Sequence, residues 1–130
     1  MFNLKTAAKH SELFSLFSHI VTGCDPEISQ SKPSPEIFTL CASRYLLTNI
    51  STSLRLTFSL SRFPDPPNTA NCLVFEDAPN GVTAGLAAGM QVVMVPDHKV
   101  TKEFMLPATQ VLASMEHFQP EDFGLPPFSV

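Results

Sequence analysis

An apolar run that stops abruptly at two adjacent carboxylates constrains this chain more than any other feature. Residues 73–75 are Leu, Val and Phe, Glu76 and Asp77 come next, and Pro79 opens a segment rich in alanine and glycine. A short apolar run is typical of a buried strand, and proline fits the first turn of a helix. The sequence therefore predicts a strand whose carboxyl end carries two acidic side chains at the start of a helix.

Similar patterns of helix and strand occupy much of the remaining chain. We expect helices over residues 4–17, 34–45 and 79–88 and strands over residues 17–21, 73–75 and 91–95, with a short helix after Thr101 and a weak strand at residues 111–112. Gly89 suits the left-handed position that often follows a helix. Strands that alternate with helices are typical of the α/β class with a parallel sheet.

Residues 46–61 do not fit this order. Leu54, Leu56, Phe58 and Leu60 alternate with polar residues, which is the period-2 pattern of a strand. One interpretation is that this segment replaces a lost strand and rebuilds a sheet. The other, which we favour, is an insertion from altered splicing or gene prediction whose alternation is accidental.

Composition and charge argue against several classes of function. A chain of 130 residues has room for one domain, and a net charge of −4 without a basic stripe argues against nucleic-acid binding. No run is long and apolar enough to span a membrane and no secretory signal follows Met1, so we expect a cytoplasmic protein. Cys24, Cys41 and Cys72 are odd in number and lack metal-type spacing, which indicates reduced thiols.

A lysine followed by two closely spaced prolines, Pro33 and Pro35, precedes the second predicted helix. After Lys32, Ser34 can act as the N-cap and Pro35 fits the first helical position. Lysine and a helix N-terminus both suit an anionic phosphate, although a lone lysine is more often a solvated loop residue. On spacing alone, Glu76 and Asp77 have two interpretations, a helix cap beside a solvated carboxylate or two oxygen ligands for Mg²⁺.

The lysine and acidic elements together resemble the third and fourth motifs of phosphatases of the haloacid dehalogenase type. The matching positions are Lys32-Pro33-x-Pro35-x-Ile37-Phe38, Val74-Phe75-Glu76-Asp77-Ala78-x-x-Gly81-Val82-x-Ala84 and Ala87-Ala88-Gly89-Met90. The resemblance covers nearly the whole chain except residues 46–61. It implies an α/β fold over residues 1–130, an incomplete Rossmannoid core of parallel strands with flanking helices, in which 46–61 is an atypical insert and 118–130 a C-terminal tail.

The resemblance also implies a chemistry. In that family an aspartate attacks the phosphate of a small phosphomonoester and forms an aspartyl-phosphate with Mg²⁺ present. Carried over to this chain, Lys32 is the lysine that neutralises the charge of the phosphate and the nucleophile. Glu76 and Asp77 are the expected Mg²⁺ ligands, and Asn80 is close enough in the sequence to supply a polar contact.

The aspartate that acts as nucleophile in the family has no counterpart among these motifs. No Asp-x-Asp pair occurs among the 130 residues, and the helical cap of the family has no counterpart. The sheet of the family has the strand order fifth, fourth, first, second, third, and this chain retains patterns for the third, fourth and fifth. We therefore expect a gap of about 10–15 Å, at ~4.8 Å per strand, together with uncovered apolar helix faces.

These departures favour an enzyme fragment, such as a truncated isoform, that is inactive by itself. The alternative is a non-catalytic interaction module that retains part of the fold and binds a partner protein of unknown identity. An active phosphatase with another nucleophile is disfavoured, because only Asp25 lies in a plausible loop and nothing there pairs with it as acid or base.

Overall fold

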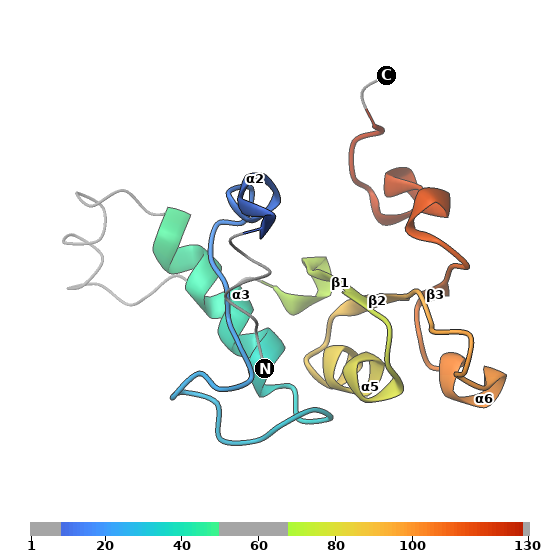
Figure 1. Cartoon of the computed structure of the whole chain (residues 1–130), viewed down its shortest axis with the longest axis horizontal. Helices are drawn as coiled ribbons and strands as arrows, with labels where there is room; N and C mark the ends of the chain where they lie inside the picture. Colours follow the sequence, from blue (N-terminus) through green and yellow to red (C-terminus); the bar gives the residue numbers. More distant parts are fainter. Residues whose placement is uncertain (1–8, 50–67, 129–130) are drawn as a thin grey trace.

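The computed structural model describes residues 9–49 and 68–128 of the chain (Figure 1). The alternating segment at residues 54–60 lies outside the described residues, so both interpretations of it stay open. The elements in chain order are α2 (Ser11–Phe14), α3 (Glu36–Asn49), β1 (Leu73–Glu76), α5 (Pro79–Ala87), β2 (Gln91–Met94), α6 (Lys102–Met105) and β3 (Gln110–Val111), with 3-10 turns at Thr69–Asn71, Met115–His117 and Pro120–Phe123. None of the helices in the described ranges is long and apolar enough to cross a membrane.

The strands form one parallel sheet in the order β1-β2-β3. Leu73 pairs with Gln91 and Glu76 with Met94, so β1 and β2 are in register over their whole length. The two residues of β3 then pair with Val93 and Met94. Helices lie between consecutive strands and return the chain to the same end of the sheet, which confirms the predicted α/β arrangement.

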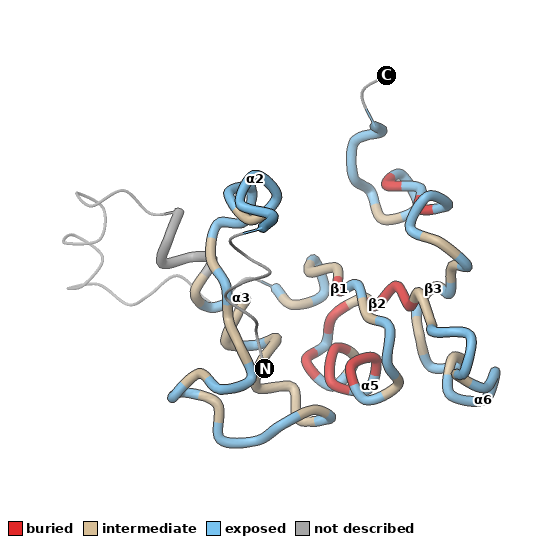
Figure 2. The backbone as a smooth tube through the Cα atoms, in the orientation of Figure 1, coloured by how far each residue is buried: buried red, intermediate tan, exposed pale blue. Residues whose placement is uncertain are grey.

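Helix α5 packs on one face of the sheet, and the two together form the core (Figures 1 and 2). Val82 and Ala84 of α5 are buried, as are Val92 and Met94 of β2. The approach is close, because a Cβ at Gly85 would lie 2.7 Å from Val92 Cγ2. Small residues on α5 therefore set the distance between helix and sheet, and this fixes where the end of β1 lies relative to the start of α5.

Aromatic side chains from the C-terminal segment pack on part of the opposite face of the sheet, where Phe75 stays 42% exposed. Phe75 alternates with the buried Val74 and therefore points away from α5. The Phe118 ring meets the Phe75 ring edge-on, with 4.9 Å between centroids, and stacks on the Phe123 ring at 5.7 Å. The segment predicted as a tail thus contributes a packed aromatic cluster within the described residues.

Most of the predicted elements are present with shifted ends. α3 begins at Glu36 and runs through residues 46–49 of the segment predicted as an insert. α5 begins at Pro79 and is followed by Gly89 with a φ of 74°, as predicted for a glycine after a helix. Of the helix predicted over residues 4–17, the described part is helical at Ser11–Phe14.

The strand predicted at residues 17–21 is wrong. These residues form no strand, and the His19 ring donates instead from Nε2 to the Cys41 carbonyl of α3 at 2.9 Å. A strand needs a hydrogen-bonded neighbour, and the described sheet ends at β1 on that side. The gap was expected between residues 17–21 and residues 73–75, so with no strand at residues 17–21 it stays a prediction, and the three described strands are contiguous in the order β1-β2-β3.

Gly85→Ala is expected to loosen the packing of α5 on the sheet. Its new Cβ would stand 2.7 Å from Val92 Cγ2, so the helix or the Val92 side chain must shift. The cost is about 1–3 kcal/mol, which should speed hydrogen exchange at the β2 amides by about 5- to 150-fold. Ala87→Ser, at an exposed position of the same helix, is the control, and equal exchange in the two variants would contradict the close approach.

Candidate functional site

The three charged residues predicted for the site meet at the carboxyl end of β1. A cavity of about 340 Å³ there is lined by Lys32, Phe75, Glu76, Asp77, Val95 and Met115. Lys32 comes from the loop ahead of α3, whereas the two carboxylates come from the end of β1 and the turn into α5. Asn80, in the first turn of α5, is exposed and does not line this cavity. The carboxyl ends of parallel strands are the usual place for ligand sites in open α/β sheets.

An ion pair joins Lys32 to Glu76 across the cavity. Lys32 Nζ donates to Glu76 Oε1 and also lies 4.9 Å from the centroid of the Phe38 ring, a cation–π distance. The Glu76 side chain is 9% exposed and the Lys32 side chain 35%, so the carboxylate is the more deeply buried partner. A buried carboxylate needs such a partner, because its desolvation is costly unless it is paired.

Gly81 is the residue that makes room for the Glu76 carboxylate. A Cβ at Gly81 would overlap the carboxylate carbon and oxygens of Glu76, so no other residue fits here without a shift. Gly81 lies in the first turn of α5, where the helix dipole favours negative charge. The sequence motifs include Gly81 but assign it no role. A glycine five positions after a carboxylate, in the turn from a strand into a helix, is the signal that indicates a close approach of this kind.

The donor set at this end of β1 fits Mg²⁺ in type. Asp77 is exposed beside Glu76, and carboxylate oxygens are the ligands that Mg²⁺ prefers. Among the residues that the structure describes, no group of three or more His, Cys, Asp or Glu side chains could hold a metal ion. Two carboxylates would therefore have to be completed by waters and by oxygens of a substrate, which is a common arrangement for Mg²⁺.

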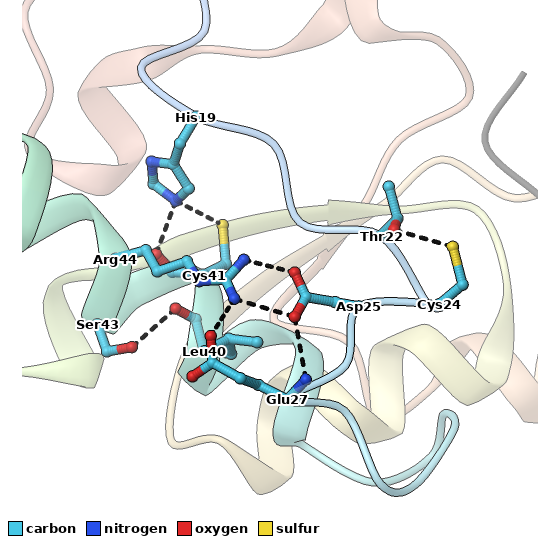
Figure 3. Close-up of polar contacts among 9 residues, drawn as sticks. All are labelled: His19, Thr22, Cys24, Asp25, Glu27, Leu40, Cys41, Ser43 and Arg44. Carbon is cyan, nitrogen blue, oxygen red and sulfur yellow. Dashed lines mark hydrogen bonds and ion pairs between the residues drawn. The ribbon is translucent and has the colours of Figure 1, made fainter. Parts of the chain in front are cut away.

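Arg44 of α3 holds the start of the loop that precedes this helix and contains Lys32 (Figure 3). Its guanidinium donates to both carboxylate oxygens of Asp25, at 2.5 and 2.9 Å, and pairs with Glu27 as well. The hydrogen bond from Arg44, with a smaller effect from the Glu27 backbone N–H, holds the pKa of Asp25 below its ordinary value. Asp25, considered above as an alternative nucleophile, is thus engaged with Arg44 rather than placed in the cavity.

Glu36 closes the rest of the loop onto the first turn of α3. Its carboxylate accepts from the Ser29 backbone N–H at 2.7 Å, from the Ser29 hydroxyl at 2.7 Å and from the Gln30 N–H at 2.8 Å. These hydrogen bonds, that of the Ser29 hydroxyl first, lower the pKa of Glu36. Lys32 lies inside this closed turn, so the contacts help to place it opposite Glu76.

A second and larger cavity runs along the edge of β1 that faces away from β2. It has a volume of about 730 Å³ and is lined by His19, Phe38, Cys41, Ala42, Asn68, Asn71, Cys72, Leu73, Val74, Phe75 and Met90. Most of these side chains are apolar, and they come from α3, from β1, from the segment ahead of β1, from His19 in the loop before α3 and from Met90 just before β2. This groove lies on the side of β1 where the sequence predicted missing strands.

The amino-acid sequence is similar to those of known phosphatases. No protein-family model matches it. It is 50% identical over 130 residues to a probable pseudouridine-5'-phosphatase of Drosophila melanogaster, which covers 99% of this chain and 48% of that protein. It is 47% identical over 128 residues to (DL)-glycerol-3-phosphatase 1, mitochondrial, of Arabidopsis thaliana, covering 98% of this chain and 37% of that protein. It is also 44% identical to (DL)-glycerol-3-phosphatase 2 of that plant, covering 98% of this chain and 45% of the relative.

The chain is therefore homologous over nearly its whole length to phosphatases of the haloacid dehalogenase family, as its lysine and acidic motifs predicted. It spans less than half the length of these relatives.

The loop around Lys32 should respond to acid through Glu36. The folded-state pKa of this carboxyl lies below its ordinary value of 4.5, so its contribution is fully present above 4.5 and is lost as the pH falls through the lowered value. The Ser29 and Gln30 amide shifts should titrate with a midpoint below 4.5 in NMR spectra. Glu36→Gln should abolish this titration, whereas Glu103→Gln, at an exposed position of α6, should not. A midpoint at or above 4.5 would contradict the assignment.

Proposed function

We propose that this chain forms the phosphate- and Mg²⁺-binding portion of a phosphatase of the haloacid dehalogenase family, and that these 130 residues do not hydrolyse phosphomonoesters by themselves. The observation that carries the proposal is that Lys32, Glu76 and Asp77 line one cavity at the carboxyl end of β1. Lys32 reaches this cavity from a segment 44 positions away from Glu76 in the sequence. The relatives named above are phosphatases that share nearly all of this chain.

In this proposal each of the three residues has its own role. Glu76 and Asp77 would hold Mg²⁺, which when bound supplies positive charge to the phosphate oxygens. Lys32, already at the mouth of the cavity, would neutralise the remaining charge of a phosphomonoester dianion. Asn80, exposed on the first turn of α5, would offer a polar contact to the rest of the substrate.

The inactivity follows from what the cavity lacks among the described residues. Its carboxylates are Glu76 and Asp77, which the proposal assigns to the metal, and neither is left over as a nucleophile. Asp25 is held by Arg44 and does not line the cavity. The sequence contains no Asp-x-Asp pair. A cytoplasmic location and a small phosphomonoester such as pseudouridine 5′-phosphate as the substrate of a complete enzyme belong to the same proposal.

The second candidate function is a non-catalytic interaction module. The observation that favours it is the 730 Å³ groove along β1, which is more than twice the volume of the 340 Å³ cavity at the end of the strand. A large, mainly apolar groove beside an edge strand is typical of a surface that binds a polypeptide.

Asp77→Asn is expected to abolish binding of Mn²⁺, used in place of Mg²⁺ because its free fraction can be measured by electron paramagnetic resonance. The wild-type chain should bind about one Mn²⁺ weakly, since two carboxylates are the only protein ligands in the proposal. Glu103→Gln removes one exposed carboxylate from α6 and leaves the charge change the same, so it is the matched control. Equal binding in the two variants would place the cation elsewhere.

The wild-type chain is expected to release no phosphate from pseudouridine 5′-phosphate or p-nitrophenyl phosphate with Mg²⁺ present. The reason is the missing nucleophile, because positioning and charge neutralisation alone give no aspartyl-phosphate. Phosphate release can be followed by a colorimetric assay over several hours. Turnover that survives in Glu103→Gln but disappears in Asp77→Asn would show that the chain carries a nucleophile after all.

A further inference from the structure

We propose that Phe38 is a positioning residue for Lys32, and that the face of its ring keeps the ammonium group at the mouth of the cavity once Glu76 is engaged with a divalent cation. Lys32 Nζ lies 4.9 Å from the centroid of the Phe38 ring while it donates to Glu76 Oε1. The inference rests on the proposed function, in which Glu76 holds Mg²⁺ and Lys32 binds phosphate, and it adds a residue to which that proposal gives no role.

The two partners of Lys32 within the described residues attract it in different ways. The Glu76 carboxylate is a negative charge for which a divalent cation competes, because Mg²⁺ prefers oxygen ligands. The Phe38 ring attracts an ammonium group through the negative face of its π-system and has no oxygen to offer. A divalent cation at Glu76 therefore separates Lys32 from one partner and leaves the other in place.

The contact with the ring matters because the Lys32 side chain is otherwise mobile in kind. The side chain is 35% exposed, and lysine carries its charge on a flexible four-carbon stem. A stem without a partner would spread over many rotamers in solvent, and phosphate binding would then have to restrict them. The ring restricts the stem in advance, which lowers the entropic cost of binding an anion at the cavity.

Phe38 is itself held firmly enough to position another side chain. It lies in the first turn of α3, where its N–H donates to the Pro35 carbonyl at 3.0 Å. The residue is half-buried and packs against the core that α5 forms with the sheet. The ring is thus a fixed surface for Lys32, which comes from a loop. A role in packing alone is the competing explanation, and it requires only the size and apolarity of the ring.

The experiment weakens the face of the ring without removing the ring. Phe38 is replaced in the full 130-residue chain by phenylalanines that carry one, two and three ring fluorines, introduced at this position alone. Fluorine withdraws electron density from the face, so the attraction for an ammonium group falls stepwise while the ring stays apolar. Inorganic phosphate is titrated with Mg²⁺ in excess and followed by the NMR amide shifts of Asp77 and Ala78. Its dissociation constant should rise stepwise, by about 2- to 5-fold with three fluorines.

A spectroscopic signature reports on Lys32 directly. The ring should shift the ε-methylene protons of Lys32 upfield, and this shift should persist when Mg²⁺ is added and be lost in Phe38→Leu. The matched control places three fluorines on Phe123, which is half-buried like Phe38 but stacks on Phe118 at 5.7 Å and does not line the cavity. The phosphate affinity of this control should equal that of the wild-type chain. Unchanged hydrogen exchange at the Val93 amide verifies that each variant keeps the core.

The outcomes separate this inference from the proposed function. Lys32→Met should weaken phosphate binding. If the affinity is unchanged, or if the wild-type chain binds no phosphate, the role of Lys32 is wrong and the inference falls with it. If Lys32→Met weakens binding but the fluorinated rings at Phe38 bind phosphate as tightly as the native ring, Phe38 only packs against the core and the proposed function stands. An equal loss with the fluorines on Phe123, or loss of the upfield shift of Lys32 when Mg²⁺ is added, would also overturn the role of Phe38.

Discussion

The ion pair between Lys32 and Glu76 is the contact on which the rest of the arrangement depends. It joins the loop ahead of α3 to the end of β1, although the two residues lie 44 positions apart. The net free energy of such a pair is small, because attraction and desolvation nearly cancel. Its main consequence is that it positions the loop ahead of α3 against the end of β1. With Lys32 fixed on Glu76, α3 stands beside β1, and this defines both the cavity at the end of the strand and the groove along its edge.

Both cavities adjoin β1, the strand whose outer edge has no partner strand in the described residues. Phe75 lines both of them, with its ring packed edge-on against Phe118 on the face of the sheet away from α5. A complete sheet would bury this edge on both sides, as parallel sheets usually are. Here α5 covers one face of β1 and the aromatic cluster part of the other, while its outer edge has α3 nearby but no strand in the described residues. The cavity at the end of β1 and the groove along its edge therefore adjoin on one element.

The parts of the fold that were predictable are those specified by local sequence. The run that ends at Glu76, the proline that starts α5 and Gly89 after it each carry their own signal, and the structure has them where they were predicted. The strand at residues 17–21 failed because an apolar run becomes a strand only if a neighbour supplies hydrogen bonds, which composition does not reveal. The meeting of Lys32 with Glu76 came from family resemblance, since no local pattern links positions so far apart. The fit of Gly81 against the Glu76 carboxylate is a contact in three dimensions that no local sequence pattern specifies.

The Glu76 carboxylate has two candidate partners, the Lys32 ammonium group and a divalent cation, and this affects how cation and phosphate binding influence each other. In the structure Lys32 already neutralises it, so a divalent cation must compete with an ammonium group that is in place. A phosphate dianion in the same cavity would attract Lys32 toward itself and release Glu76 for the cation. Each ligand would then raise the affinity for the other, because coupling between two binding events is reciprocal. In this proposal a weak cation site in the unliganded chain and a tighter one in a complex with phosphate would be two states of the same three side chains.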